Sequence, residues 1–214
     1  MKKKRFTAMF LAAAVFCMTA LSGCSQGQGD VEREKEITIA INSETGTLDP
    51  AGSIALTYLA YSVSALDELL TFDENGEIEY RAAESYEVNE DSTQWTFHLR
   101  EDALWSDGTP VTAADFLNTI RRALDPASGS GYAVYLFPIE NAEAIYNGEM
   151  SMDSLGVETP DDHTLIFRLG EPCVYFLDLL RLPVYTPSCE KYADSVDSGW
   201  DKDPQTSLSN GPFA

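Results

Sequence analysis

The chain has 214 residues, 44% of them hydrophobic, and carries 35 Asp plus Glu against 14 Lys plus Arg, a formal net charge of −21 at pH 7. A surface this acidic repels phosphate backbones and therefore argues against nucleic acid as a partner, while most of its carboxylates are equally well explained as a solvated surface. The length and the apolar content suffice for one or two domains with a buried core.

The first 23 residues are typical of an export signal. Four basic residues precede an uncharged, mostly apolar run from Phe6 to Leu21, which is shorter than the ~20 apolar residues of a membrane-spanning helix. The run ends in LSGC at residues 21–24, which resembles a bacterial lipoprotein box. We therefore expect residues 1–23 to be a lipoprotein signal peptide, Cys24 to carry the lipid and residues 24–35 to be a flexible tether. An ordinary signal peptide followed by an incidental cysteine is the alternative.

Removal of the signal would make the chain still more acidic. The mature chain would keep 10 Lys plus Arg against 35 Asp plus Glu, a formal charge of −25. Such a charge suits a soluble domain that is held off an anionic membrane surface by a tether.

The folded part is expected to open with a strand, a polar loop and a long helix. Isoleucines alternate with polar or small residues over residues 36–42, which predicts a strand. Residues 43–50, SETGTLDP, are typical of a loop closed by a proline. Apolar residues recur at helical spacing over residues 54–70 and predict a helix with one packed face.

The sequence TFDENGEIEY at residues 71–80 predicts a β-hairpin with a tight turn at its Asn-Gly pair. Four acidic or amide side chains between residues 73 and 84 imitate the ligand positions of a calcium loop. Ile78, however, stands where such a loop needs glycine. We predict a hairpin without bound calcium.

The clearest local pattern lies in the middle of the chain. Apolar residues alternate with polar ones over residues 95–99 and predict a half-buried strand. Ser-Asp-Gly at residues 106–108 predicts a tight turn. Thr112 and Asp115 have the spacing of a capping box, and apolar residues at helical intervals follow until Pro126.

The next segment, PASGSG at residues 126–131, predicts a flexible loop. Three aromatic residues follow it between residues 132 and 137, and they fit a pocket wall and a packed core equally well. A short helix is expected over residues 139–146, and a hairpin over residues 155–169.

The last part of the chain is expected to be mainly helical. We predict helices from Pro172 and over residues 188–196, and a turn at residues 209–213. Cys173 and Cys189 remain after the signal cysteine and the lipid-carrying cysteine are set aside. Export permits a disulfide between them, and two buried thiols fit as well.

The sequence offers no constellation that favours catalysis or metal binding. The G-x-S-x-G and H-E-x-x-H motifs are absent, and the carboxylates are too numerous to single out a catalytic pair. His98 and His163 are expected in separate settings, without further ligands beside them. We therefore predict no catalytic residue, no metal and no cofactor, which makes a secreted hydrolase the weakest alternative.

A family resemblance is carried by four runs of the sequence. The strand WTFHLR followed by W-SDGTPVTAADF resembles the signature region of the extracytoplasmic solute-binding proteins of the oligopeptide and dipeptide class, which deliver ligands to ABC importers. SGYAVYL, LGVETPDDHTLIFRL and SNGPF resemble further runs of the same family. The resemblance covers nearly everything after residue 36, while its members are several hundred residues long.

The resemblance implies a mixed α/β (α+β) fold. The chain would supply a fragment of a periplasmic-binding-protein-like type II lobe and the family's small accessory domain, with the second lobe missing. Residues 36–56 and 190–214 would form the partial lobe I, and residues 57–189 the accessory domain.

The resemblance also implies where a ligand would bind. Ser43, Glu44 and Thr45 match the segment after the first strand, which lines the family's ligand cleft, and Tyr132 matches a tyrosine that borders the peptide site. From the residues alone, a polar surface loop is the favoured interpretation of residues 43–45.

The function implied by the resemblance is that of a substrate-binding component. The complete protein would be a monomer that captures oligopeptides and delivers them to an ABC permease and ATPase complex. It would lie outside the cytoplasm, anchored to the cell membrane through Cys24. A protein for another solute (a dipeptide, a sugar or a metal chelate) and a surface sensory or adhesion module are the alternatives.

Overall fold

The computed structural model describes residues 38, 40, 46–52, 61–62, 64–193, 199–203 and 205–213. Residues 40–214 form one compact unit. The predicted export signal, Cys24, most of the predicted first strand and the ligand candidates Ser43, Glu44 and Thr45 lie outside the described residues. In the part of the chain that is described, no helix is long and apolar enough to cross a membrane.

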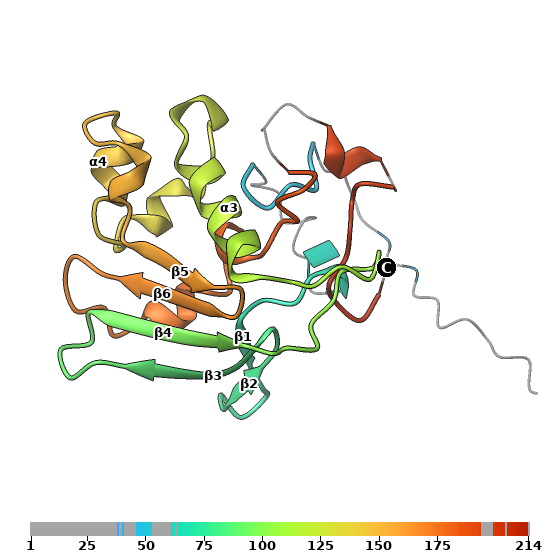
Figure 1. The fold of residues 1–214 in the computed structure, drawn as a ribbon, viewed down its shortest axis with the longest axis horizontal. Helices are drawn as coiled ribbons and strands as arrows, with labels where there is room; N and C mark the ends of the chain where they lie inside the picture. The colour runs from blue at the N-terminus through green and yellow to red at the C-terminus, as the bar shows by residue number, and fades with distance from the viewer. Residues whose placement is uncertain are drawn as a thin grey trace, which may run out of the picture. The chain divides into compact units, whose positions relative to one another are not determined.

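The larger sheet of the described structure has four antiparallel strands (Figure 1). Its strands lie in the order β3 (Ala83–Val88), β4 (Gln94–Leu99), β6 (Thr164–Arg168) and β5 (Val157–Asp161). In β4, Trp95, Phe97 and Leu99 are buried, while the side chains between them are half-buried. The alternation predicted for this strand is therefore confirmed, as is the hairpin of β5 and β6.

Helix α3 (Ala113–Leu124) packs against β5 and against the 3-10 turn η4 (Pro183–Tyr185). The carboxylate of Asp115 accepts the backbone N–H of Thr112 at 2.8 Å, which confirms the predicted capping box. The helix ends at Leu124, because the proline after Asp125 cannot continue it.

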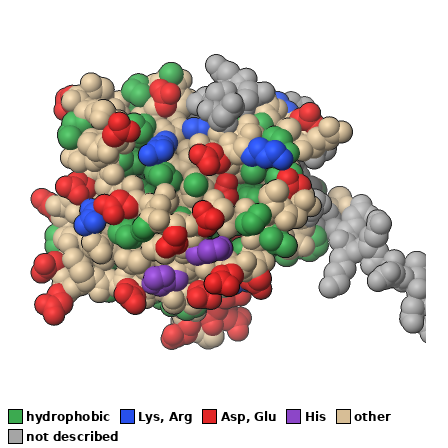
Figure 2. Space-filling view, viewed as in Figure 1, with side chains coloured by type: hydrophobic (Ala, Val, Ile, Leu, Met, Phe, Trp, Pro, Cys, Tyr) green, Lys and Arg blue, Asp and Glu red, His purple; other side chains and the backbone are tan. Residues whose placement is uncertain are grey.

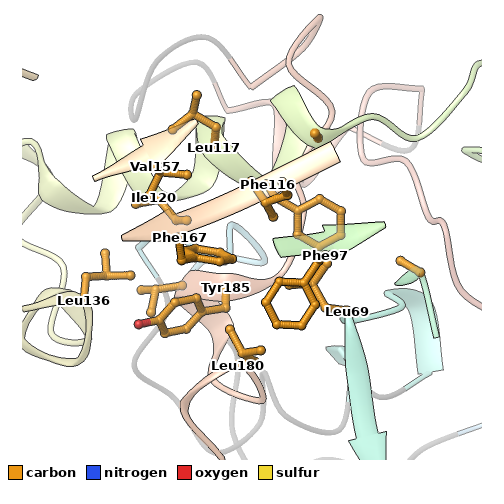
Figure 3. Packing of buried hydrophobic residues seen from close by; sticks show 14 of the residues in the cluster. Leu69, Phe97, Phe116, Leu117, Ile120, Leu136, Val157, Phe167, Leu180 and Tyr185 are labelled. Atoms are coloured by element: carbon orange, nitrogen blue, oxygen red, sulfur yellow. The ribbon is translucent and has the colours of Figure 1, made fainter. Parts of the chain in front are cut away.

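The core is built from aromatic rings of the sheet and of the segment that follows it. The ring centres of Phe97 and Phe167, on neighbouring strands, are 5.9 Å apart. Phe167 contacts Phe176 of α5 (Phe176–Leu179) at 5.3 Å and Tyr185 of η4 at 6.0 Å. Figure 3 shows Phe116 of α3 among the same rings. Large buried rings in edge-to-face contact join the sheet to α5 and η4.

The helix predicted over residues 54–70 ends earlier than expected. Residues 61, 62, 64 and 65 are helical, residues 66–69 are not, and Leu70 opens β1 (Leu70–Phe72). The carbonyl of Leu69 accepts the N–H of Ala83 at 3.0 Å, and the carbonyl of Glu68 accepts the N–H of Ala82 at 2.9 Å. Pairing with this distant segment overrides the helical spacing of the leucines.

Strand β1 and strand β2 (Ile78–Tyr80) form the predicted hairpin. The carboxylate of Asp73 accepts the backbone N–H groups of Asn75 and Glu77, both at 2.8 Å, and Gly76 has a positive φ of 81°. The amide of Glu77 in the first place, and Asn75 with it, hold the pKa of Asp73 below its usual value. This carboxylate is therefore used by the turn itself.

The segment after α3 is more ordered than predicted. Asp125 caps a 3-10 turn, η1 (Pro126–Ser128), by accepting the N–H of Ala127 at 2.8 Å. A second 3-10 turn, η2 (Ala133–Leu136), leads to the predicted short helix, α4 (Ala142–Tyr146). The remaining short turns are η3 (Met152–Ser154) and η5 (Trp200–Lys202).

Two predicted helices are shortened or replaced. The helix expected from Pro172 is reduced to α5, and the described part of the helix expected over residues 188–196 forms turns. The N–H of Ser188 donates to the carbonyl of Asp115 at 3.2 Å, and the N–H of Glu190 donates to its carboxylate at 2.8 Å. These two bonds join the segment after η4 to α3.

Of the two open predictions for the cysteines, the structure supports buried thiols. Cys173 and Cys189 are both free and buried. Burial raises the pKa of the Cys189 thiol.

Candidate functional site

Among the predicted ligand residues, only Tyr132 lies in the described structure. It precedes η2 and is half-buried, and its ring centre lies 5.6 Å from that of Tyr135. Ser43, Glu44 and Thr45 are outside the described residues, so the structure does not bring them together with Tyr132. Their proposed role in ligand binding remains a prediction.

The three aromatic residues that follow the η1 turn do not all belong to the core. Tyr135 is exposed, and Tyr132 and Phe137 are half-buried. The hydroxyl of the buried Tyr185 donates to the carbonyl of Tyr135 at 2.9 Å and so holds the backbone of η2 against the core. Val134 is exposed beside them. The alternative that all three rings lie in the core is therefore wrong, because Tyr135 is exposed, while the half-buried Tyr132 packs against the core.

The turn of residues 46–52 follows the predicted ligand segment directly and has a defined polar geometry. The hydroxyl of Thr47 donates to the carboxylate of Asp201 at 2.5 Å, and the N–H of Leu48 donates to the same oxygen at 2.8 Å. The carboxylate of Asp49 accepts the N–H of Ala51 at 2.9 Å. Two carboxylates therefore define the path of this turn.

Asp49 also forms a buried ion pair with Arg122 of α3. The Nη2 of Arg122 donates to Oδ1 of Asp49 at 2.7 Å, and Nη1 donates to Oδ2. The side chain of Asp49 is 4% exposed and that of Arg122 is 6% exposed. The guanidinium also donates to the hydroxyl of Ser188 at 3.1 Å and lies 5.7 Å from the centre of the Trp200 ring. Segments far apart in the sequence meet at this pair.

This network was not predicted from the sequence, although one signal was present. Asp115, Thr119 and Arg122 stand three and four residues apart on a helix whose neighbouring positions are apolar. All three are buried. A polar stripe inside an apolar helix face indicates buried polar partners, since an unpaired buried charge is costly.

The final described segment binds the region before β1. The amide of Asn210 bonds to Asp67 on both sides: its oxygen accepts the N–H of Asp67 at 3.0 Å, and its nitrogen donates to the carbonyl at 3.2 Å. The hydroxyl of Ser209 donates to the carbonyl of Ala65 at 2.6 Å. A Cβ on Gly211 would lie 2.8 Å from the carbonyl carbon of Ala65. This close approach explains the glycine of the predicted turn.

The two histidines lie nearer to each other than expected. His98 faces Thr164 in the pairing of β4 with β6, and the N–H of Leu99 donates to the carbonyl of His163 at 2.8 Å. Figure 2 shows both imidazoles close together on a face with many acidic side chains. The expectation of separate settings was wrong, because the sheet joins the end of β4 to the turn before β6. Among the residues that the structure describes, no group of three His, Cys, Asp or Glu side chains could hold a metal ion.

The sequence of this chain matches the model of a known protein family. The model of the bacterial extracellular solute-binding proteins, family 5 (middle region), matches residues 77–214. The chain belongs to this family. The matched residues include the sheet, α3 with its buried polar stripe and the segment that binds Asp67.

Individual relatives agree with the family 5 assignment. The chain is 35% identical over 214 residues to the periplasmic oligopeptide-binding protein OppA of Escherichia coli, an alignment that covers 99% of this chain and 39% of that protein. This family 5 chain therefore spans about two-fifths of the length of that relative.

Solved structures of the family resemble the fold. The substrate-binding domain of an oligopeptide ABC transporter from Bacillus anthracis superposes with a TM-score of 0.77 at 36% identity, covering 82% of this chain and 34% of that one. The Haemophilus influenzae OppA complex with RPPGFSPFR gives a TM-score of 0.73 at 35% identity and covers 79% and 33%, respectively. The predicted mixed α/β fold and the prediction of a partial family 5 lobe are confirmed.

Proposed function

We propose that the parent protein, meaning the complete polypeptide of which this chain spans a part, captures oligopeptides and delivers them to the permease and ATPase subunits of an ABC importer. The similarity to an oligopeptide-binding protein over 99% of the chain carries the proposal. The likeness to a family structure in complex with RPPGFSPFR supports it. The proposed role is binding, without catalysis.

In this proposal the peptide lies between two lobes that close around it. Its extended backbone pairs with main-chain groups of the protein, while its side chains enter tolerant pockets. Pairing through the backbone does not depend on side-chain identity and favours broad specificity. Ser43, Glu44 and Thr45 are proposed to line the cleft, and Tyr132 to border it. The half-exposed ring of Tyr132 supports its part in this assignment.

The proposed domain organisation follows the sequence. Residues 1–23 are the signal peptide, residues 24–35 the tether, residues 36–56 and 190–214 the partial lobe I, and residues 57–189 the accessory domain. The mature protein is proposed to be a monomer outside the cytoplasm, with no nucleic acid partner. Acyl chains on Cys24 would bind it to the membrane through their buried methylene groups. Mass spectrometry of the protein exported by its native host is expected to show a lipid-modified Cys24, and an unmodified cysteine would contradict this anchor.

Isothermal titration of the parent protein with a peptide library tests the ligand. We expect binding of peptides several residues long, with affinity that depends more on peptide length than on side-chain sequence. Dipeptides, sugars and metal chelates serve as the comparison set. Binding of one of these without binding of any longer peptide would contradict oligopeptide capture and favour the corresponding alternative.

A further inference from the structure

We propose that the second lobe of the parent protein packs on an exposed apolar surface, the Val-Tyr face, which consists of Val134, Tyr135, Val174 and Tyr175. The four side chains belong to two turns that lie far apart in the sequence. The inference rests on the proposed function for the existence of a second lobe, while the face itself is made of described residues.

In η2, two exposed side chains stand between two buried ones. Val134 is 55% and Tyr135 is 43% exposed, whereas Ala133 and Leu136 on either side of them are buried. The N–H of Tyr135 donates to the carbonyl of Tyr132 at 3.0 Å, which fixes the backbone of the turn. The buried neighbours and the turn therefore hold this Val-Tyr pair on the surface.

The segment that leads into α5 repeats this pattern. Val174 is 92% and Tyr175 is 55% exposed, between the buried Cys173 and Phe176. The N–H of Phe176 donates to the carbonyl of Cys173 at 3.3 Å, and its ring centre lies 6.0 Å from that of Tyr185. Among the described residues, no other large hydrophobic side chain is as exposed as Val174.

The buried Tyr185 joins the two turns. Its hydroxyl donates to the carbonyl of Tyr135 at 2.9 Å. Burial raises the pKa of the same hydroxyl, and the neighbouring Cys173 and Tyr175 raise it further, so the second turn also lies beside it. The two Val-Tyr pairs therefore flank one buried residue and belong to one surface.

The composition of the Val-Tyr face indicates a protein partner. A contiguous group of exposed apolar side chains marks an interaction surface, and tyrosine is enriched at the centre of such surfaces. The face is an exception on a chain whose formal net charge is −21. Because both turns are already held in place, docking costs little conformational entropy.

The length of the family's proteins favours the second lobe as the occupant. The alignment with OppA of Escherichia coli covers 39% of that protein, and the Haemophilus influenzae complex is covered to 33%, so most of each relative lies outside the part described here. Tyr132, proposed to border the peptide cleft, has its ring centre 5.6 Å from that of Tyr135. The Val-Tyr face therefore begins at the proposed border of the cleft, where a lobe that closes over the peptide would cover it.

Cysteine labelling in the parent protein tests whether the face is covered. Val174→Cys and the control Val88→Cys are each reacted with a maleimide, and peptide mapping by mass spectrometry reads the modification at that position alone. Each rate is divided by the rate of the same variant unfolded in urea, which removes differences in intrinsic thiol reactivity. Val174 is 92% and Val88 is 43% exposed, so an uncovered face predicts faster labelling at position 174.

We expect the opposite order. With peptide bound, position 174 should be labelled about tenfold more slowly than position 88, because only the fraction of molecules in which the lobe has moved away can react. Removal of the peptide should speed labelling at position 174 and leave position 88 unchanged. Titration calorimetry on the same variants measures peptide binding, and melting curves show that both are folded.

The outcomes separate this inference from the proposed function. Faster labelling at position 174 than at position 88 in the peptide-bound protein would overturn the inference and leave peptide capture intact. Slowing that increases with protein concentration would assign the face to a second copy, and slowing that differs between saturating peptides would assign it to the peptide; both would overturn the inference. If the parent protein binds no peptide, the proposed function fails, while the order of the two rates in the free protein still decides whether the second lobe covers the face.

Discussion

The indole N–H of Trp105 donates a hydrogen bond to the carboxylate of Asp115 at 3.1 Å. The same carboxylate accepts the backbone N–H of Thr112 at the start of α3 and that of Glu190 after η4. One buried side chain thus joins the tryptophan of the family signature to the helix start and to a segment 75 residues away. The polar groups of the signature region bind one another, so we infer that this region has a structural role and supports the fold.

Replacement of Asp115 by asparagine tests this structural role. Both oxygens of Asp115 accept N–H groups, whereas an asparagine has only one acceptor oxygen. Its NH₂ group would lie opposite at least one N–H that then lacks an acceptor. We expect the parent protein to lose about 2–3 kcal/mol of stability, since hydrogen bonds to a buried charged group are involved. Thermal unfolding measures the loss. Asp102→Asn is the control, because the Asp102 side chain is 87% exposed, and equal melting of the two variants would contradict the structural role.

Gly211 provides a second test, of how the final segment packs. A Cβ at this position would lie 2.8 Å from the carbonyl carbon of Ala65 and 2.9 Å from the N of Leu66, both backbone atoms. We expect Gly211→Ala to destabilise by about 1–3 kcal/mol through overpacking. Gly170→Ala is the matched control, as nothing lies within 4 Å of its added Cβ. Should both variants melt alike, the segment does not depend on this close approach.

The sequence predicted those elements whose signals are local. The alternation around Trp95 and the capping residues of α3 lie within a few positions of the structure that they specify. The helix predicted up to Leu70 was wrong over residues 66–70, where the carbonyls of Glu68 and Leu69 bond to Ala82 and Ala83, and the described part of the helix predicted from Ser188 forms turns. Hydrophobic spacing carries no information about such partners.

The candidate site shows the same limit. Asp49 and Arg122 are 73 residues apart, and nothing in the sequence around Asp49 indicates a buried partner. The buried polar stripe of α3 indicated that partners exist without identifying them. Ser43, Glu44, Thr45 and Tyr132 came from the family resemblance, and of these the structure describes only Tyr132.

Glu68 predicts a pH dependence of stability. Burial raises its pKa to about 7, and Arg181 and Arg81 oppose this shift while Asp67 adds to it. Burial raises the pKa of Asp67 too. Below pH 4.5 the Glu68 carboxyl is protonated in the folded and unfolded states. Between about 4.5 and 7 only the folded state keeps the proton, so the free energy of unfolding falls as pH rises, by at most about 3 kcal/mol.

Glu68→Gln is expected to remove the decrease in the free energy of unfolding with rising pH that is due to Glu68. Melting temperatures of the parent protein at pH 5 and pH 8 should differ less in Glu68→Gln than in the wild type, and the variant should be the more stable protein at pH 8. A residual slope from Asp67 is expected to remain. Glu84→Gln, an exposed position on β3, is the control. An unchanged difference between the two pH values in Glu68→Gln would contradict the prediction.

Tyr132 offers the direct test of a ligand contact within the described residues. Its ring is half-buried against Tyr135, so a bound peptide would touch an aromatic surface that is already held in place. Loss of one aromatic contact costs about 0.5–1.5 kcal/mol, so Tyr132→Ala in the parent protein is expected to weaken peptide binding about three- to tenfold. Tyr132→Phe keeps the ring and should bind within about twofold of the wild type if the ring, rather than the hydroxyl, makes the contact.

Tyr80→Ala, at an exposed tyrosine on β2, controls for the general effect of removing a surface ring. Titration calorimetry gives the affinities, and melting curves show whether each variant is folded. A folded Tyr132→Ala variant with wild-type affinity would remove Tyr132 from the binding site and leave residues 43–45 as the remaining candidates in this chain.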